Sequence, residues 1–324
     1  MESEYLEKMH LPLSIAPGSR ILIAGAGGGY DFLCGLPIAL FLQNLGHEIL
    51  FANYSFSRLN EIEDAEWVNE SILSVKPNSK MKNNGYFPEG KLSRWFKSEQ
   101  NKDVPIFCFS NLGVKSLTRV YDFLFQRHSI SHLILIDGGV DGIFRGDEFD
   151  LGTPSMDSIS IIGASLSRIP NKIYSITAFG SEGLKGEISH AQVLNRISDL
   201  IKIDKMLGVT SLLKSSQIGE TFIKAVKFIY QNSQRDHESN IVSSLIKSMI
   251  GEFGDTAVNS KTQERKIWIS PLTSLFWFFD LCAVAEMKIF HKDVLETDSV
   301  EEVNKILETI RKDKQFSKRD QIPI

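Results

Sequence analysis

The sequence predicts an α/β fold in which a doubly wound, mostly parallel sheet is followed by a helical C-terminal part. Three observations support this class: short apolar runs alternate with segments of helical spacing, glycine-rich or acidic turns follow the apolar runs, and the last third is mainly helical. Apolar runs without polar alternation are typical of parallel strands that are buried on both faces. Strands that alternate with helices form βαβ units, so we expect a Rossmann-like architecture.

The first βαβ unit is the clearest. Residues 20–24 are expected to form a buried strand, a glycine turn follows at 25–31, and a helix spans 35–45. Gly46 and His47 end this helix, and 48–53 gives the next strand.

A polar, irregular interval at about 55–101 follows, and we expect it to be an insertion that leaves the sheet, with a short helix at 88–98. Long insertions of this kind often cover a site. The alternation then resumes. The expected elements are a strand at 105–110, a helix at 115–127, a strand at 132–137, a helix at 155–166, a strand at 172–179 and a helix at 189–203.

The C-terminal region, 208–324, is expected to be mainly helical and to pack on the 1–207 core as part of one body. Helical spacing is the signal used here. It predicts helices at 220–231, 241–249, 272–287 and 300–312, with one further strand at 266–269.

Composition and charge argue against several classes of protein. With 324 residues, 42% of them hydrophobic, the chain can bury a sizeable core. A net charge of -4 without a basic stripe gives no electrostatic footprint for nucleic acid. Three cysteines without CxxC spacing argue for a reducing compartment and against zinc. Since neither a signal peptide nor an apolar run of bilayer length stands out, we expect a cytoplasmic protein that does not contact a membrane.

The glycine-rich and acidic turns all follow expected strands, which predicts the position of a ligand site. In an open α/β sheet, ligands bind at the carboxyl ends of the strands. The turns at 25–31, 110–113, 137–148 and 180–183 are therefore expected to line one pocket. The candidate ligand-binding residues are Gly25, Gly27, Gly28, Gly29, Tyr30, Asp31, Asn53, Asn111, Gly138, Gly139 and Arg145.

The glycine turn at 25–29 can hold an anionic group, because successive backbone N–H groups and a following helix N-terminus favour negative charge. The dinucleotide fingerprint G-x-G-x-x-G would need glycine where Tyr30 stands, and Asn53 replaces the usual acidic ribose partner. We therefore expect a nucleotide- or sugar-like ligand rather than an ordinary hydride-transfer dehydrogenase. Asp31 is the candidate partner of a ribose-like hydroxyl or a cation. A tight turn without a ligand is the alternative.

Carboxylates crowd the turn after the strand at 132–137. The candidate catalytic residues are Asp137, Asp141, Asp147, Glu148 and His190. Carboxylates brought together need a cation or a polar ligand to compensate their repulsion. Asp137 and Asp141 are also candidate metal ligands, and Mg²⁺ or Ca²⁺ would suit them because His and Cys are absent from the turn. Turn capping by Asp147 and a structural role for His190 are the alternatives.

Several segments together resemble a known family. They are Gly25–Asp31 with Gly35-Leu36-Pro37, Asp137-Gly138-Gly139-Val140-Asp141 leading to Arg145-Gly146-Asp147-Glu148, Leu151-Gly152-Thr153-Pro154, and Trp268-Ile269-Ser270-Pro271-Leu272. Over about residues 18–310 the chain resembles the prokaryotic family called domain of unknown function 1152. The resemblance implies a fold more than an activity. Ser270 and Gly142 depart from it, where Asn and a hydroxyl residue would be typical.

These residues predict a nucleotide- or ribose-binding enzyme, a hydrolase or transferase that acts on an N-glycosidic or phosphate bond of a nucleotide-like or NAD-like substrate. One carboxylate would orient or activate water, directly or through a divalent cation, while glycine-turn amides hold an anionic group. The alternative is a non-enzymatic ligand-sensing or scaffold subunit of a larger assembly. The aromatic run around Trp277 indicates core packing or a homo-oligomer interface, and we expect a homo-oligomer.

Overall fold

Five parallel strands form the centre of the main sheet in the computed structural model, which describes residues 10–148, 151, 154–182, 189–234, 237–264 and 266–312. The five are β1 (Arg20–Gly25), β2 (Glu48–Tyr54), β7 (Ile106–Phe109), β8 (His132–Asp137) and β9 (Asn171–Ile176). Their order across the sheet is β9-β8-β1-β2-β7, with every neighbouring pair parallel. All five match strands expected from the sequence.

Four antiparallel strands extend this centre to a nine-stranded mixed sheet. Beyond β9 lie β13 (Leu275–Asp280) and then β10 (Met206–Ser211), and beyond β7 lie β5 (Leu73–Val75) and β4 (Glu66–Trp67). The expectation of a mostly parallel sheet therefore holds for the central strands alone. Both the insertion and the C-terminal region contribute strands to the same sheet.

The helix expected at 272–287 is wrong. Residues 275–280 form strand β13, and only the short helix α9 (Leu281–Glu286) follows it. The reason is the aromatic run Phe276-Trp277-Phe278-Phe279, because bulky aromatic side chains favour strands and can fill both faces of a sheet. Phe276 and Phe278 pack in the core on one face, and Phe279 packs in the core on the other.

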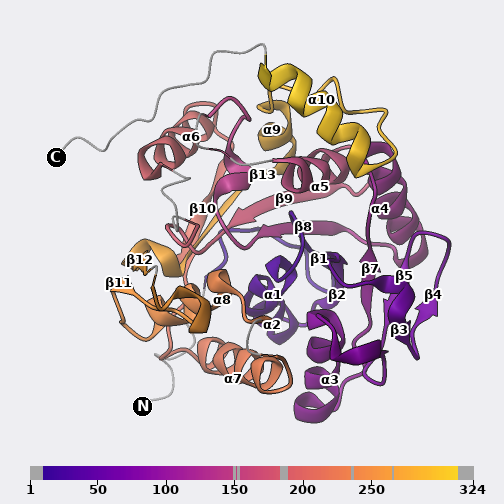
Figure 1. Ribbon diagram of the computed structural model, residues 1–324, viewed down its shortest axis with the longest axis vertical. Coiled ribbons are helices and arrows are strands. Elements are labelled where there is room, and N and C mark those ends of the chain that lie inside the picture. The colour runs from indigo at the N-terminus through magenta and orange to yellow at the C-terminus, as the bar shows by residue number, and fades with distance from the viewer. Residues whose placement is uncertain are drawn as a thin grey trace.

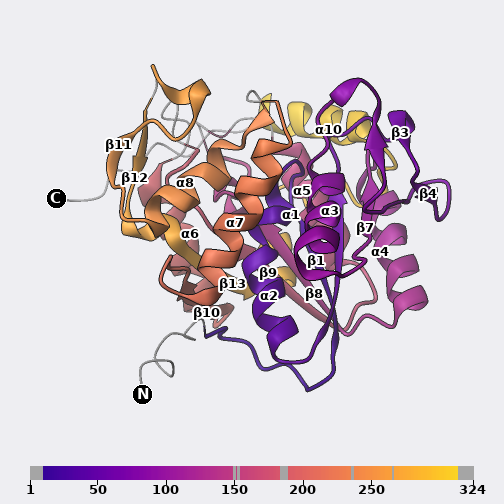
Figure 2. The same cartoon turned by 90° about the horizontal axis from the view of Figure 1, so that it is seen from below.

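Helices cover both faces of the sheet, and each face has its own apolar core. One face carries α1 (Asp31–Cys34), α2 (Leu36–Asn44), α3 (Pro88–Gln100), α7 (Gln217–Gln231) and α8 (Asn240–Met249). The other carries α4 (Val114–His128), α5 (Ser155–Ser165), α6 (His190–Lys202), α9 and α10 (Val300–Lys312). Figure 1 shows the two groups above and below the sheet, and Figure 2 shows α2, α3 and α7 across the lower face. None of the helices in the described part is long and apolar enough to cross a membrane.

Two small sheets lie outside the main one. The insertion pairs β3 (Ile62–Glu63) with β6 (Lys80–Met81), and the C-terminal region pairs β11 (Gly254–Thr256) with β12 (Ile267–Ile269). In Figure 1 they lie at opposite sides of the molecule.

The order of the strands changes direction at β1, which in an open α/β sheet is where ligands bind. From β1 the chain proceeds outward to β2 and β7, and then returns to β8 on the other side of β1. The helices that follow β1 and β8 therefore lie on opposite faces, so the two strand ends are not covered by one connection. The turn after β1 contacts the end of β8 there, since the Ala26 N–H donates to the Ile136 carbonyl at 2.8 Å.

Candidate functional site

Five acidic side chains meet at the carboxyl ends of β1, β8 and β9, where each is within electrostatic reach of others. Asp31 begins α1 after the glycine turn, and Asp137 ends β8. Asp141 opens a 3-10 turn at Asp141–Ile143, Asp157 lies in the first turn of α5, and Glu182 follows β9. We call these five residues the acid cluster.

The loop after β8 holds three of these carboxyl groups through its backbone. The Gly138 N–H donates to Asp31. The Gly142 N–H donates to Asp137 Oδ2 at 3.1 Å, and the Val140 N–H donates to Glu182 Oε2 at 2.7 Å. One short loop thus fixes carboxyl groups that come from three different strand ends.

The glycines of the site make room for these carboxyl groups. A Cβ on Gly138 would lie 2.7 Å from Asp31 Oδ1, and a Cβ on Gly142 would lie 2.6 Å from Asp137 Oδ2. A Cβ on Gly139 would likewise contact the Glu182 carboxylate, and a Cβ on Gly27 would contact the Asp157 carboxylate. These glycines therefore pack directly against the protein's own acidic side chains.

Burial and mutual repulsion hold protons in the acid cluster. Burial raises the pKa of Asp31, Asp157 and Glu182 well above the usual range, and neighbouring carboxylates raise it further. Burial, followed by the charge of Asp141, raises the pKa of Asp137 to about 7. Glu182 also shares a side-chain hydrogen bond with Asp141, which requires a proton between the two carboxyl groups. Protonated and ionised carboxyl groups therefore coexist here near neutral pH.

Tyr174 and Lys288 complete the surroundings of Asp137. The Tyr174 hydroxyl donates to Asp137 Oδ2 at 2.7 Å from the neighbouring strand. Lys288 is buried, and its ammonium donates to the carbonyls of Gly142 at 2.6 Å and Phe144 at 2.5 Å. Burial lowers the pKa of Lys288, while the charges of the acid cluster oppose that effect. The ammonium thus offsets part of the negative charge and ties α9's C-terminal side to the acidic loop.

A pocket of about 550 Å³ reaches the acid cluster at Asp31 and Glu182, which form part of its wall. Both side chains are partly accessible, whereas Asp137 behind them is buried. The glycine turn and a group of aromatic rings form other parts of the lining. The lining residues are Gly28, Gly29, Tyr30, Asp31, Phe56, Tyr86, Ser181, Glu182, His237, Glu238, Ser239, Asn240, Ile241 and Lys261. The volume falls in the range of pockets for small-molecule ligands.

The glycine turn presents backbone groups to this pocket. Gly27, Gly28 and Gly29 have φ values of +85°, +109° and +65°, which glycine adopts without strain. Within the part of the chain that the structure describes, the N–H groups of Gly28 and Gly29 donate no hydrogen bond. The half-exposed ring of Phe56 packs against both glycines.

The comparison with protein families places this geometry in a known group. The family described as "Protein of unknown function (DUF1152)" matches residues 22–312. The chain belongs to this family. The resemblance seen in the sequence is thereby confirmed. Comparisons with curated proteins and with solved structures found no match. Membership in DUF1152 gives no activity, so the function has to be argued from the site.

Two of the ligand-binding candidates lie beneath the glycine turn of this DUF1152 chain. Asn53 is fully buried, and its side-chain amide donates to the Gly29 carbonyl at 3.0 Å and to Glu89 Oε1 at 2.8 Å. Gly25 packs against Asn53, because a Cβ there would lie 2.6 Å from Asn53 Oδ1. Both residues shape the turn from below.

Other candidates lie away from the pocket. Asn111 is exposed and lines a neighbouring cavity of about 740 Å³ that includes Tyr54 and Arg58. The single pocket expected from the sequence is therefore divided in two, and Phe56 lines both parts. The expected turn at 180–183 contributes Ser181 and Glu182, and residue 183 lies outside the described residues. The same holds for residues 152 and 153 of the family motif.

The second half of the acidic turn folds onto itself. The Glu148 carboxylate accepts the Arg145 N–H at 2.9 Å and the Gly146 N–H at 2.8 Å. Arg145 is exposed, and Asp147 lies beside Glu148 in the same turn. His190 begins α6, where its ring packs between Phe179 and Trp268 with centroid distances of 4.9 Å and 5.7 Å. Catalytic roles for Asp147, Glu148 and His190, and a ligand role for Arg145, stay predictions.

Four residues of the site were missed by sequence reasoning. Glu182 lies in a turn that was expected at the site, but it is not among the candidate residues, and Asp157 lies in the first turn of α5. Tyr174 lies within a strand, and Lys288 follows a helix far along the chain. The glycines at 27 and 139 were the available signals for Asp157 and Glu182, since a glycine can mark close packing of a side chain.

The side chains of the site do not form a metal cage. Among the described residues, no group of three or more His, Cys, Asp or Glu side chains is placed to hold a metal ion. Mg²⁺ or Ca²⁺ at Asp137 and Asp141 stays a prediction from the sequence.

Proposed function

We propose that this protein is an enzyme that binds a nucleoside- or ribose-containing small molecule in the pocket above the glycine turn, releases its base and transfers the ribosyl group to water or to another hydroxyl group. The observation that carries the proposal is the place of Asp31 and Glu182. Both lie in the pocket wall, and both belong to a cluster in which protons are retained. Protonated carboxyl groups are thus available at the ligand surface, next to the other carboxyl groups of the cluster.

The chemistry follows from the unequal protonation of neighbouring carboxyl groups. A protonated carboxyl group can donate its proton to a leaving base, and an ionised one can accept a proton from water or from an acceptor hydroxyl. Hydrolysis and transfer then differ only in the molecule that receives the ribosyl group, which is water in hydrolysis and a hydroxyl compound in transfer. Asp137 is buried behind the wall, so we assign it a positioning role in which it sets the protonation of Asp31.

The charge of the cluster favours an N-glycosidic bond over a phosphate bond. Cleavage of a glycosidic bond builds positive charge on the sugar ring, which nearby carboxylates stabilise. A phosphate group at the same place would be repelled by them. We therefore prefer the N-glycosidic alternative.

The surroundings of the pocket support a nucleoside-sized ligand. Tyr30 and Tyr86 pack edge to face with centroids 5.5 Å apart, and Tyr86 packs against His237 at 5.7 Å, so that aromatic surface borders the pocket. Aromatic faces suit a flat base. Carboxyl oxygens of Asp31 and Glu182 suit ribose hydroxyls as hydrogen-bond acceptors. The point at β1 where the strand order changes direction is also where ligands bind in Rossmann-like sheets, which is the topology we propose here.

The proposal is tested with a panel of purine and pyrimidine nucleosides, nucleoside monophosphates and NAD, followed by chromatography for the released base. We expect turnover of at least one ribosyl compound. Asp31→Asn and Glu182→Gln should lower the rate by about 10²- to 10⁴-fold, because each removes a group that transfers a proton. Asp103→Asn is the matched control, since Asp103 is an exposed surface carboxylate paired with Lys97.

Two outcomes would overturn the enzymatic proposal. One is that no member of the panel binds or reacts. The other is that a nucleoside binds by calorimetry, no base is released, and Asp31→Asn and Glu182→Gln leave the affinity unchanged. The second outcome would favour a ligand-sensing or scaffold subunit, which needs the pocket but not its acids.

A further inference from the structure

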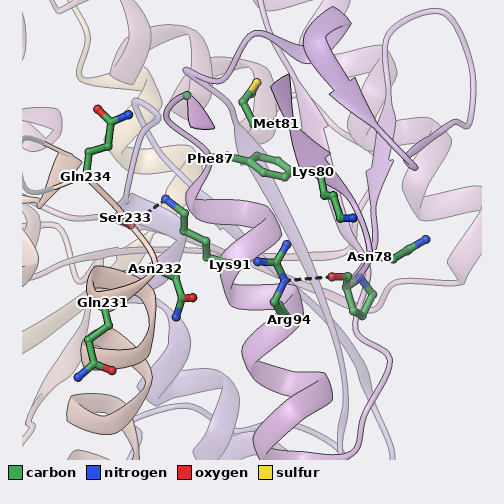
Figure 3. A pocket seen from close by; sticks show the side chains of 12 residues that line it. Asn78, Lys80, Met81, Phe87, Lys91, Arg94, Gln231, Asn232, Ser233 and Gln234 are labelled. Carbon is green, nitrogen blue, oxygen red and sulfur yellow. Dashed lines mark hydrogen bonds between the residues drawn. The ribbon is translucent and has the colours of Figure 1, made fainter. Parts of the chain in front are cut away.

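A third cavity, of about 630 Å³, lies between the insertion and the turn after α7. Figure 3 shows Lys80 of β6 on one side, Lys91 and Arg94 of α3 below, and the residues that follow α7 on the other side. The lining includes the side-chain amides of Asn78, Gln231, Asn232 and Gln234, and none of the lining residues that the structure describes is acidic. It shares no lining residue with the pocket at the acid cluster. We call this cavity the basic pocket.

The cations of the basic pocket make contacts only with neutral groups. Lys91 Nζ donates to Ser233 Oγ at 2.8 Å. The Arg94 guanidinium donates to the Pro77 and Ser79 carbonyls at 3.4 Å and 3.3 Å, which are long hydrogen bonds. Within the described part of the chain, Lys80, Lys91 and Arg94 form no ion pair.

Other cations of the same region are paired. Lys76 pairs with Glu66 at 2.6 Å, Lys82 with Glu63 at 3.7 Å, and Lys97 with Asp103 at 2.7 Å. By contrast, the three cations that face the basic pocket have no carboxylate partner among the described residues. Carboxylates are available in this part of the chain, but they lie elsewhere.

Lys91 and Arg94 are three residues apart on α3, which places them on one face of the helix. Lys91 is half-buried, and burial together with the charge of Arg94 lowers its pKa to about 8. The two positive charges repel each other at the cavity wall. An anion between them would relieve that repulsion and restore the charged form of Lys91.

We propose that the basic pocket binds a small molecule through a phosphate group held by Lys91 and Arg94, with Lys80 at its rim. A guanidinium presents parallel N–H groups to two phosphate oxygens, and an ammonium adds a point charge. The volume exceeds that of a phosphate group, so the amides of Asn78 and Gln231 in the lining can form hydrogen bonds to the rest of the molecule. This site goes beyond the proposed reaction, because it lies in a different cavity and contains none of the reacting acids.

The test uses inorganic pyrophosphate as the probe, in calorimetric titrations of the full chain at constant ionic strength. We expect saturable binding that Lys91→Gln and Arg94→Gln each weaken about tenfold or more. Lys97→Gln is the matched control, because Lys97 lies on the same helix but faces solvent and Asp103. Its affinity should match that of the unchanged protein. The affinity should also fall as the pH rises through about 8, where Lys91 loses its proton.

The Lys80→Gln variant shows whether weaker binding can occur without unfolding. Lys80 is exposed, so this variant should keep its thermal midpoint while it binds pyrophosphate several-fold more weakly. Asp31→Asn and Glu182→Gln should bind pyrophosphate as the unchanged protein does, which separates this site from the proposed reaction centre.

Three results would overturn the proposal. They are an absence of pyrophosphate binding, an equal loss in Lys97→Gln and in Arg94→Gln, which indicates nonspecific attraction, and tighter binding of citrate than of pyrophosphate, which indicates a carboxylate site.

Discussion

Tyr174 donates its hydroxyl hydrogen to Oδ2 of Asp137 across 2.7 Å, from a neighbouring parallel strand. The bond favours the ionised carboxylate, as does the Gly142 N–H that reaches the same oxygen. Burial and the charge of Asp141 act in the opposite direction. The pKa of about 7 at Asp137 is therefore a balance, and changing one partner should move it.

Tyr174→Phe should raise the pKa of Asp137 further, because it removes a donor to the ionised form. It should also cost about 1.5–3 kcal/mol of unfolding free energy, the usual worth of a hydrogen bond to a charged group. Carbon-13 NMR titration of the carboxyl group and urea denaturation measure the two effects. Tyr121→Phe is the matched control, since the Tyr121 hydroxyl is buried and has no partner among the described residues. A Tyr174→Phe protein with an unmoved pKa would show that this bond does not set the protonation of Asp137.

Stability should fall as the pH rises through neutrality. Asp137 has a pKa of 3.8 when unperturbed and about 7 in the fold, so between these values the folded chain keeps a proton that the unfolded chain releases. Its contribution is fully present below about pH 4 and is lost as the pH rises through about 7, with a slope of at most about 1.4 kcal/mol per pH unit. Urea denaturation at pH 5, 6, 7 and 8 measures the slope. Asp137→Asn should reduce the slope to the part that comes from Asp31, Asp157 and Glu182, and Asp103→Asn should leave it unchanged. An equal slope in both variants would exclude Asp137 as a source.

Gly139→Ala should displace the Glu182 carboxylate, because the added Cβ meets that group. We expect a loss of stability of about 1–3 kcal/mol from this overpacking, together with loss of turnover. The comparison is a double-mutant cycle with Glu182→Ala. In the Glu182→Ala background, Gly139→Ala should lower the stability little, because the carboxylate that the added Cβ would meet has been removed. Equal costs in both backgrounds would show that Gly139 matters for another reason.

Glu148→Ala should weaken the fold rather than the reaction. It leaves the Arg145 and Gly146 N–H groups without their acceptor and removes a charge near Lys288, which should cost about 1–3 kcal/mol. Turnover measured well below the thermal midpoint should stay within about threefold of the unchanged protein. An inactive but fully stable Glu148→Ala protein would instead support the catalytic role predicted from the sequence.

The central fold could be predicted from the sequence because its signals are local. The apolar runs of β1, β2, β7, β8 and β9 and the helical spacing between them need no knowledge of distant partners. Strand β13 could not be recognised in this way, since an aromatic run suits a buried helix or a strand until its neighbours are known. β4, β5 and β10 are short or of mixed polarity, and their strand conformation depends on pairing with strands that are already in place.

The site was predictable where a residue lies at a strand end. Asp31, Asp137 and Asp141 follow β1 and β8 closely, so chain order was enough to bring them together. Lys288 reaches the same place from the C-terminal region, and only the packing of α9 decides that. Asn111 shows the reverse case, in which a strand end at the right edge of the sheet opens into a different cavity.

The position of β13 bears on the order in which the chain can fold during synthesis. The central parallel strands are complete once β9 has been made, but the outer edge of β9 then exposes unpaired backbone groups until residues 275–280 emerge. Strand β10 is synthesised earlier, but its partner in the main sheet is β13. It therefore also stays unpaired until residues 275–280 emerge. A nascent chain therefore carries an open sheet edge for about a hundred residues of synthesis, roughly 5–20 s at ordinary elongation rates. During that interval this edge is where another strand could add, and a truncation before residue 275 would leave it open permanently.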